Sequence, residues 1–167
     1  MIIEARGKKP ILGENVFVAD NARIVGDVVV GNHASIWYNV TIRGDVMPIS
    51  IGTETNIQDG SVLHGTYGKY SCKIADRVTI GHSVILHGCT IGRKCLIGMG
   101  SIVMDGAEIG EHSVVGAGSL VTEGKKFEPY SLIMGRPAVF KRKLTEEEIK
   151  FLDQSADNYL LYKTWYE

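Results

Sequence analysis

The stretch that decides the fold of this chain runs from residue 91 to residue 121 and reads IGRKCLIGMGSIVMDGAEIGEHSVVGAGSLV. An aliphatic residue returns at every sixth position, and these residues are Ile91, Ile97, Val103, Ile109, Val115 and Val121. Glycine often follows the aliphatic residue directly, and the fourth position after it usually carries a small side chain, as at Cys95 and Ser101. The repeating unit is therefore six residues long.

The same period continues toward the N-terminus. The earlier aliphatic residues are Val18, Ile24, Val30, Ile36 and Ile42, then Ile51, Ile57 and Leu63, then Ile74, Ile80 and Leu86. Short insertions separate these runs, and a five-residue step joins the last of them to Ile91. One register therefore accounts for residues 18–121.

A period of six fits neither an α-helix, whose period is about 3.6 residues, nor a sandwich with irregular loops. It predicts a chain that coils as a triangular prism, in which each unit makes one short strand and one corner. Three units close a coil, and successive coils stack at the strand spacing of about 4.8 Å. The aliphatic residue fills the prism, and glycine is expected to relieve the backbone at the turn.

A different pattern follows the repeat. We expect the hexapeptide β-helix to cover residues 10–124 and residues 125–144, which include Pro137, to form a connection. Thr145 is a predicted N-cap with a capping-box glutamate at Glu148. Apolar residues then recur at helical spacing, which predicts one amphipathic helix over 145–165 that packs along the prism or on a neighbouring subunit. The whole of 1–167 is expected to form a single domain.

The composition sets the remaining limits. The chain has 167 residues, 44% of them hydrophobic, and a net charge of −1, so neither nucleic acid nor a membrane surface is an expected partner. No apolar run approaches the roughly 20 residues of a membrane span, and the first residues lack the layout of a secretory signal. Three cysteines are an odd number, which disfavours a disulfide framework and favours a reducing, cytoplasmic location.

Two histidines fall on one face of the predicted prism. His64 and His87 each come one place after an aliphatic residue, Leu63 and Leu86, in successive coils of the same face. Because side chains alternate across a strand and the aliphatic residue points inward, both imidazoles should point outward, one above the other. At that spacing they can share a metal ion, with bonds of about 2.0–2.1 Å.

A third histidine lies on the adjoining face. His82 comes two places after Ile80 and is stacked above Asp59, around a corner from His64 and His87. Its ring is poorly placed to reach the same ion within its own chain, so we expect another subunit to supply it. A cyclic homotrimer suits a triangular prism that uses one face against the next subunit's other face.

Three histidines with an open fourth position are typical of a catalytic zinc site. Nitrogen ligands also accept iron, cobalt or nickel, so these remain alternatives to zinc. The competing interpretation is a polar cluster at an interface without a metal. His33 and His112 are interpreted as surface residues.

Further polar residues surround the histidines. Arg43 and Asp45 occupy the coil below His64, and Gln58 and Asp59 lie on the unit before it. Such groups are needed to orient imidazoles and a metal-bound water. We expect an intersubunit ion pair between Arg43 and Asp45 to shape the cleft and Gln58 to face the bound water.

These residues carry a resemblance to the γ-class carbonic anhydrase family over roughly residues 10–165. The motifs are Arg43-Gly44-Asp45, Asn56-Ile57-Gln58-Asp59-Gly60, Leu63-His64, Thr79-Ile80-Gly81-His82, Leu86-His87-Gly88-Cys89, Ile97-Gly98-Met99-Gly100 and Gly135-Arg136-Pro137-Ala138. The resemblance implies a mainly β fold, a left-handed parallel β-helix of hexapeptide repeats with one C-terminal α-helix. It also implies a homotrimer with zinc or iron in intersubunit sites.

The resemblance further implies roles for single residues. The positions of Arg43, Asp45, Gln58 and Asp59 support structure or catalysis in the family, and Asn158 or Tyr159 would match a helix residue near the metal. One departure counts against fast turnover. The family's acid after Arg-Gly-Asp is Val46 here, and residues 65–73 contain no Asp or Glu that could carry protons away.

Several functions therefore compete. The first is reversible CO2 hydration, in which a metal-bound hydroxide at the three-histidine site attacks CO2. A metal-dependent esterase or thioesterase would use the same hydroxide on another small-molecule substrate. A hexapeptide acyltransferase or acetyltransferase is disfavoured, because its chemistry needs fewer histidines at one site. A catalytically weak metal-binding scaffold is the non-enzymatic alternative.

Overall fold

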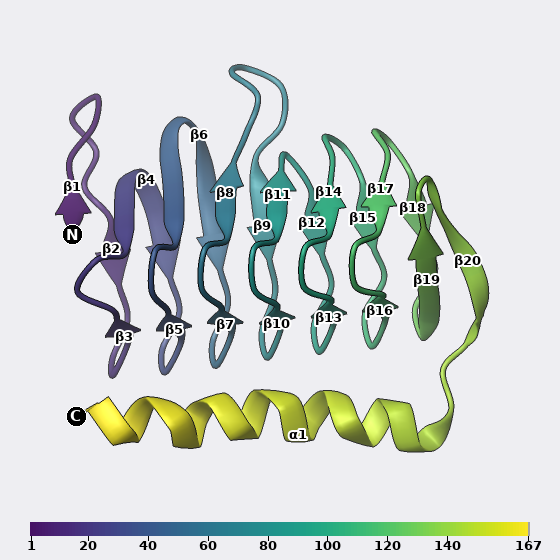
Figure 1. Cartoon of the computed structure of the whole chain (residues 1–167). Helices are drawn as coiled ribbons and strands as arrows, with labels where there is room; N and C mark the ends of the chain where they lie inside the picture. The colour runs from purple at the N-terminus through teal and green to yellow at the C-terminus, as the bar shows by residue number, and fades with distance from the viewer. Residues whose placement is uncertain (167) are drawn as a thin grey trace.

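The computed structural model describes residues 1–166, whose short strands wind into a parallel β-helix with one long helix beside it (Figure 1). The predicted fold class, a left-handed parallel β-helix with one C-terminal α-helix, is confirmed. No helix within residues 1–166 has both the length and the apolar character that crossing a bilayer requires.

The strands form three ladders, one on each face of the prism. Face one contains β3 (Phe17–Val18), β5 (Ser35–Ile36), β7 (Asn56–Ile57), β10 (Thr79–Ile80), β13 (Leu96–Ile97), β16 (Val114–Val115), β19 (Ser131–Gly135) and β20 (Ala138–Lys143). Face two contains β1 (Ile2–Ile3), the first parts of β4 (Arg23–Val30) and β6 (Thr41–Ile51), then β8 (Val62–His64), β11 (Ile85–His87), β14 (Ile102–Val103) and β17 (Leu120–Val121). Face three contains β2 (Ile11–Leu12), the second parts of β4 and β6, then β9 (Cys72–Ile74), β12 (Thr90–Ile91), β15 (Glu108–Ile109) and β18 (Lys126–Phe127).

The aliphatic residues of the repeat form the core, as predicted. From Ile24 to Val121 each of them is at most 3% exposed, whereas Val18 in the first coil is only partly buried. Burial of one such side chain contributes about 1.5–3 kcal/mol, so the stack of coils is held together mainly by this column. The register that predicts the three faces therefore describes the packing.

The role predicted for the glycines is wrong in one respect. The residue that turns the corner with a positive φ is the third after the aliphatic residue, as at Glu54 (φ 57°) and Ser83 (φ 56°). The glycine directly after the aliphatic residue is needed for space instead. A Cβ on Gly98 would lie 2.5 Å from the backbone nitrogen of Ala117 in the next coil.

The repeat also extends beyond Val121, where we expected it to end. β18 pairs with β15 through Phe127, and β19 pairs with β16 through Ile133, so two further units keep the six-residue spacing. An aromatic ring replaces the aliphatic residue in the first of these units. Residues 125–144 are thus not a plain connection, since β20 returns antiparallel against β19 before the helix begins.

The C-terminal helix α1 (Glu146–Lys163) begins at the predicted cap and is followed by a short turn η1 (Thr164–Tyr166). The side chain of Thr145 accepts from the backbone N–H of Glu148, and the Glu148 carboxylate accepts from the backbone N–H of Thr145. Of the two packing alternatives, the chain's own prism is correct. The helix runs back along the coils toward the N-terminal end and buries Leu152 and Ala156 (Figure 1).

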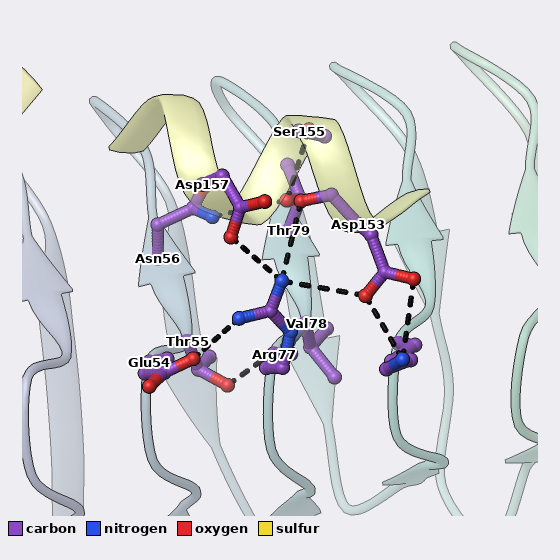
Figure 2. A network of polar contacts seen from close by, with 10 residues as sticks. Glu54, Thr55, Asn56, Arg77, Val78, Thr79, Asp153, Ser155 and Asp157 are labelled. Atoms are coloured by element: carbon purple, nitrogen blue, oxygen red, sulfur yellow. Dashed lines mark hydrogen bonds and ion pairs between the residues drawn. The ribbon is translucent and has the colours of Figure 1, made fainter. Parts of the chain in front are cut away.

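Charged residues connect this helix to the corners of three coils through ion pairs. Figure 2 shows the Arg77 guanidinium between Glu54, on the neighbouring coil, and two helix carboxylates. Its Nη2 lies 2.7 Å from Asp157 and 3.3 Å from Asp153, and Lys94 lies 2.9 Å from Asp153. Because Arg77 is only 24% exposed, losing it would leave the half-buried Glu54 and the exposed Asp157 without their cation, whereas Asp153 would keep Lys94.

We therefore expect Arg77→Gln to lower the free energy of unfolding by about 2 kcal/mol, less than for a fully buried pair because water reaches the network. Denaturant unfolding measures this difference. Arg93→Gln, at an exposed arginine nearby, is the matched control and should change stability by less than about 0.5 kcal/mol. Equal effects of the two substitutions would contradict the role of the network.

The cap of α1 should also respond to pH. Hydrogen bonds from Arg142 and from the backbone of Thr145 lower the pKa of Glu148 to about 2. Because this pKa is depressed, the stabilising contribution is present above the ordinary value of 4.5 and is lost as pH falls toward 2. Glu148→Gln should therefore melt below the parent protein at pH 6, with a difference that shrinks toward pH 2. Glu147→Gln, one residue earlier, should show no such trend.

Candidate metal centre

His64 and His87 are direct neighbours on face two. They are backbone partners in the β8–β11 ladder, which confirms the stacking predicted from the register. The Nδ1 atom of His64 lies 3.2 Å from Nε2 of His87. Two nitrogens bound to one tetrahedral zinc ion at about 2.05 Å would be about 3.3 Å apart. The separation of the two rings therefore suits a shared metal ion.

Carboxylates set the tautomers of both rings. Nε2 of His64 lies 3.2 Å from Asp45, and Nδ1 of His87 lies 3.0 Å from Asp105. Because an ionised carboxylate only accepts hydrogen bonds, each imidazole places its N–H toward its aspartate. The two nitrogens that face each other then both carry lone pairs. A metal ion is the partner that such a pair of acceptors lacks.

The surroundings of His64 favour the neutral form of its ring. Burial and the nearby Arg43 guanidinium lower the pKa of His64, and a neutral imidazole is the form that ligates metals. Burial alone would raise the pKa of Asp45, but hydrogen bonds from Arg43 and His64 outweigh it and lower that pKa. Arg43 and Asp45 are 2.6 Å apart within one chain, and an ion pair between subunits stays a prediction.

The second group of predicted residues lies around the corner on face one. Nδ1 of His82 lies 3.0 Å from Asp59, as the register predicts, so Nε2 is the nitrogen that keeps its lone pair. His82 is 46% exposed at the side chain and does not join His64 and His87. Within residues 1–166 of one chain, no three potential metal ligands gather at one point. A complete three-histidine site therefore needs a second subunit.

Gln58, beside Asp59, is 6% exposed and is fixed by a chain of polar side chains. Its amide nitrogen donates to Asn56 at 3.2 Å, and Asn56 donates to Thr79 at 3.0 Å. Thr79 in turn lies 3.1 Å from Ser155 of α1, a contact visible in Figure 2. The C-terminal helix thereby determines where the Gln58 carbonyl oxygen points.

Sequence reasoning missed Asp105, the partner of His87. Asp105 comes two places after Val103, in the coil directly above His87 on the same face, and this register could have identified it. Asp105 also accepts a hydrogen bond of 3.0 Å from Thr66, which lies in the insertion formed by residues 65–73. Gly88 makes the contact sterically feasible, because a Cβ there would lie 2.1 Å from the Asp105 carboxylate.

The remaining candidate residues differ in their surroundings. Tyr159 lies in a cavity that Asp59 also lines, and burial followed by the charge of Asp59 raises its pKa to about 12. Asn158 instead accepts from Gln154 on the helix surface, so Tyr159 is the better match for a residue near the site. His112 is not a plain surface residue. It stacks on Tyr130, and its Nδ1 atom is buried without a partner among the described residues.

Comparison with known proteins identifies the family of this chain. Residues 9–44 and 88–123 match the family described as Bacterial transferase hexapeptide (six repeats). A carbonic anhydrase of Geobacillus kaustophilus is 47% identical over 167 residues, which cover 100% of this chain and 91% of that protein. The chain belongs to the γ-class carbonic anhydrase family. A second relative, the mitochondrial γ carbonic anhydrase 1 of Arabidopsis thaliana, is 46% identical over 157 residues. The match spans only 57% of that protein's length.

The fold of this chain is also found in solved structures of hexapeptide transferases. The hexapeptide transferase family protein of Anaplasma phagocytophilum superimposes with a TM-score of 0.96 at 47% identity, covering 100% of this chain and 98% of that one. Membership of the γ-class carbonic anhydrase family thus coexists with a fold that transferases share. The shared fold does not determine the activity, which depends on the residues of the site.

Proposed function

We propose that this γ-class carbonic anhydrase family member is a metal-dependent enzyme that hydrates CO2 reversibly at a site between subunits. One observation carries the proposal. His64, His82 and His87 each direct one ring nitrogen at an aspartate, namely Asp45, Asp59 and Asp105 respectively. Each imidazole is left with one lone-pair nitrogen. Histidine ligands in metal sites almost always have such a carboxylate or carbonyl partner behind them.

The surface of the prism supports a homotrimer. The outward positions of face two are apolar in successive coils, at Val62, Ile85, Ile102 and Leu120, and the first two are 38% and 40% exposed. The outward positions of face three begin with the apolar Ile11 and Val29 and are polar from the third coil on, at Ser50, Lys73, Thr90, Glu108 and Lys126. Exposed apolar residues at equivalent positions of successive coils are typical of a surface that contacts another protein chain, here another copy. Ring closure by three copies would bring face two against the corner that carries His82.

In this arrangement, His64 and His87 of one subunit and His82 of the partner subunit would hold a zinc ion, and the same nitrogens would accept iron, cobalt or nickel. Bound zinc supplies Lewis acidity that makes water a nucleophile near neutral pH. Gln58, held by Asn56, orients the attacking water through its amide. Arg43 holds Asp45 against His64 and so keeps that ring aligned.

Turnover should be modest. The residues that would relay a proton to solvent are absent at Val46 and in 65–73, where no Asp or Glu occurs. The same activated water could instead cleave a small ester or thioester, a reaction less dependent on rapid proton export. A panel of short acyl thioesters distinguishes these substrates, since thioesterase activity above CO2 hydration would favour the second function.

The direct test combines three measurements on the purified protein. Elemental analysis should find about one zinc or iron per chain, the solution mass should correspond to three chains, and the metal-loaded protein should accelerate CO2 hydration. A metal-free trimer that binds coenzyme A would instead favour acyl transfer. A trimer that binds metal but leaves every rate unchanged would indicate a metal-holding scaffold.

Asp105→Asn tests the carboxylates behind the histidines. An amide accepts less strongly from the His87 N–H and removes a negative charge, so we expect zinc affinity to fall about 10–100-fold. Competition with a chromophoric chelator measures the affinity. Asp20→Asn, at an exposed aspartate on an early coil, should leave it unchanged. Unaltered zinc affinity in Asp105→Asn would remove this part of the proposal.

A further inference from the structure

An aromatic pocket lies where the end of α1 meets the first coils of face one. The cavity has a volume of about 200 Å³, and six of the residues that line it are aromatic: Trp37, Tyr38, Tyr159, Tyr162, Trp165 and Tyr166. The two earliest follow β5, and the others come from the last turns of α1 and from η1. Figure 1 shows this end of the helix beside the N-terminal coils. We call this cavity the aromatic pocket.

The rings that line the pocket meet at steep angles, and those around Trp37 do not stack flat. Trp37 meets Tyr159 at 81° and Tyr166 at 82°, with ring centroids 5.5 Å apart in each case. Tyr38 and Tyr166 are 6.1 Å apart at 62°. Rings at such angles form the sides of a box. A ligand inside it would contact several π-systems at once.

The described lining of the pocket carries negative charge. Among residues 1–166, Asp59 is the only charged residue in the lining, with its side chain 42% exposed. Burial, Tyr166 and the charges of Asp20 and Asp59 together raise the pKa of Tyr38, as expected for a region of negative potential. Aromatic faces are also negative because of the ring quadrupole. Anions are therefore repelled from the aromatic pocket, and cations are attracted to it.

We propose that the aromatic pocket binds a small organic cation that carries a quaternary ammonium group. Such a group cannot donate hydrogen bonds, so aromatic faces and one carboxylate satisfy it better than a set of oxygen ligands would. A bare divalent ion would need those oxygen ligands, which the lining does not supply in number. The proposal concerns binding at the aromatic pocket and holds with or without the metal centre.

Tryptophan fluorescence can report binding at this pocket. The chain contains two tryptophans, Trp37 and Trp165, and both line the aromatic pocket. Tryptophan fluorescence should therefore change saturably when choline chloride is added, with sodium chloride at equal concentration as the salt control. The neutral isostere 3,3-dimethylbutan-1-ol has the same shape without the charge. We expect choline to bind at least about fivefold more tightly than this alcohol. Equal affinities, or no saturable signal, would overturn the proposal.

Substitutions then locate the binding. Tyr166→Leu removes one aromatic wall at a 54% exposed position and should weaken choline binding at least about fivefold, whereas Tyr166→Phe should preserve it. Tyr67→Leu, at a 68% exposed tyrosine on the insertion, is the control and should have no effect. Asp59→Asn should weaken choline but not the alcohol.

Thermal unfolding must confirm that the Tyr166 variant is folded. If it is not, Trp165→Leu at a 67% exposed position replaces it, with choline binding followed by ligand-observed NMR. Undiminished choline binding in a folded variant would show that the cation binds elsewhere and would refute the assignment.

Discussion

His87→Asn is expected to abolish metal binding and to lower the rate of CO2 hydration about a thousandfold or more. His87 is one of two imidazoles whose lone-pair nitrogens lie 3.2 Å apart, and the partner subunit is needed for the third ligand. With only His64 remaining on its face, the site cannot hold an ion against water. Elemental analysis and stopped-flow CO2 hydration, both at pH 7 to 8, measure the two losses.

His33→Asn is the matched control for this substitution. His33 is a half-buried histidine at a corner with φ 60°, a backbone conformation that asparagine tolerates well. We expect this variant to keep its metal and its rate. If His87→Asn and His33→Asn hydrate CO2 equally fast, the proposed metal-dependent hydration is wrong, and if both retain metal, so is the ligand assignment.

Ile85→Asp should convert the assembly to single chains. Ile85 lies 40% exposed in the middle of the apolar column on face two, next to the strand residues that lead to His87. Burying an unpaired carboxylate at a subunit contact is strongly unfavourable. The solution mass should therefore fall from about 55 kDa, three times the chain mass, to 18.3 kDa. Metal content should fall with it, because the partner's His82 is lost.

Thr90→Asp provides the comparison on face three. Thr90 is an outward residue of β12 and is exposed to solvent, with the polar Lys73 and Glu108 beside it in the neighbouring coils. The same carboxylate placed there should leave both mass and metal content unchanged. Circular dichroism separates a folded monomer from an unfolded chain in the Ile85 variant. A folded Ile85→Asp protein that keeps the mass of three chains would exclude face two as the subunit contact.

Much of the architecture could be predicted because the repeat is local. Each six-residue unit contains its own aliphatic residue, its own small residue and its own corner. A few consecutive units are therefore enough to predict the structure of the others. The prediction was wrong after Val121 because the next unit uses Phe127, which breaks the aliphatic pattern while filling the same space. The role of the glycines was misjudged because close packing between coils cannot be read from one unit.

The candidate site, like the fold, could be predicted only in part from the sequence. The stacking of His64 on His87, and of His82 above Asp59, follows from register alone and is present in the fold. The direction of each imidazole does not follow from register. It depends on Asp45 and Asp105, and the latter is 18 residues beyond His87 in a unit with no other chemical signal.

The sequence by itself determined the prism, its three faces, the capped helix and the face on which each histidine lies. These features depend on a period, and a period is contained in any few consecutive units. The tertiary structure alone decided which ring nitrogens keep their lone pairs, how Ser155 restrains Gln58, and that rings from residues 37 and 166 enclose one pocket. Those contacts join residues far apart in the chain, and their geometry is set by how coils stack and where the helix returns.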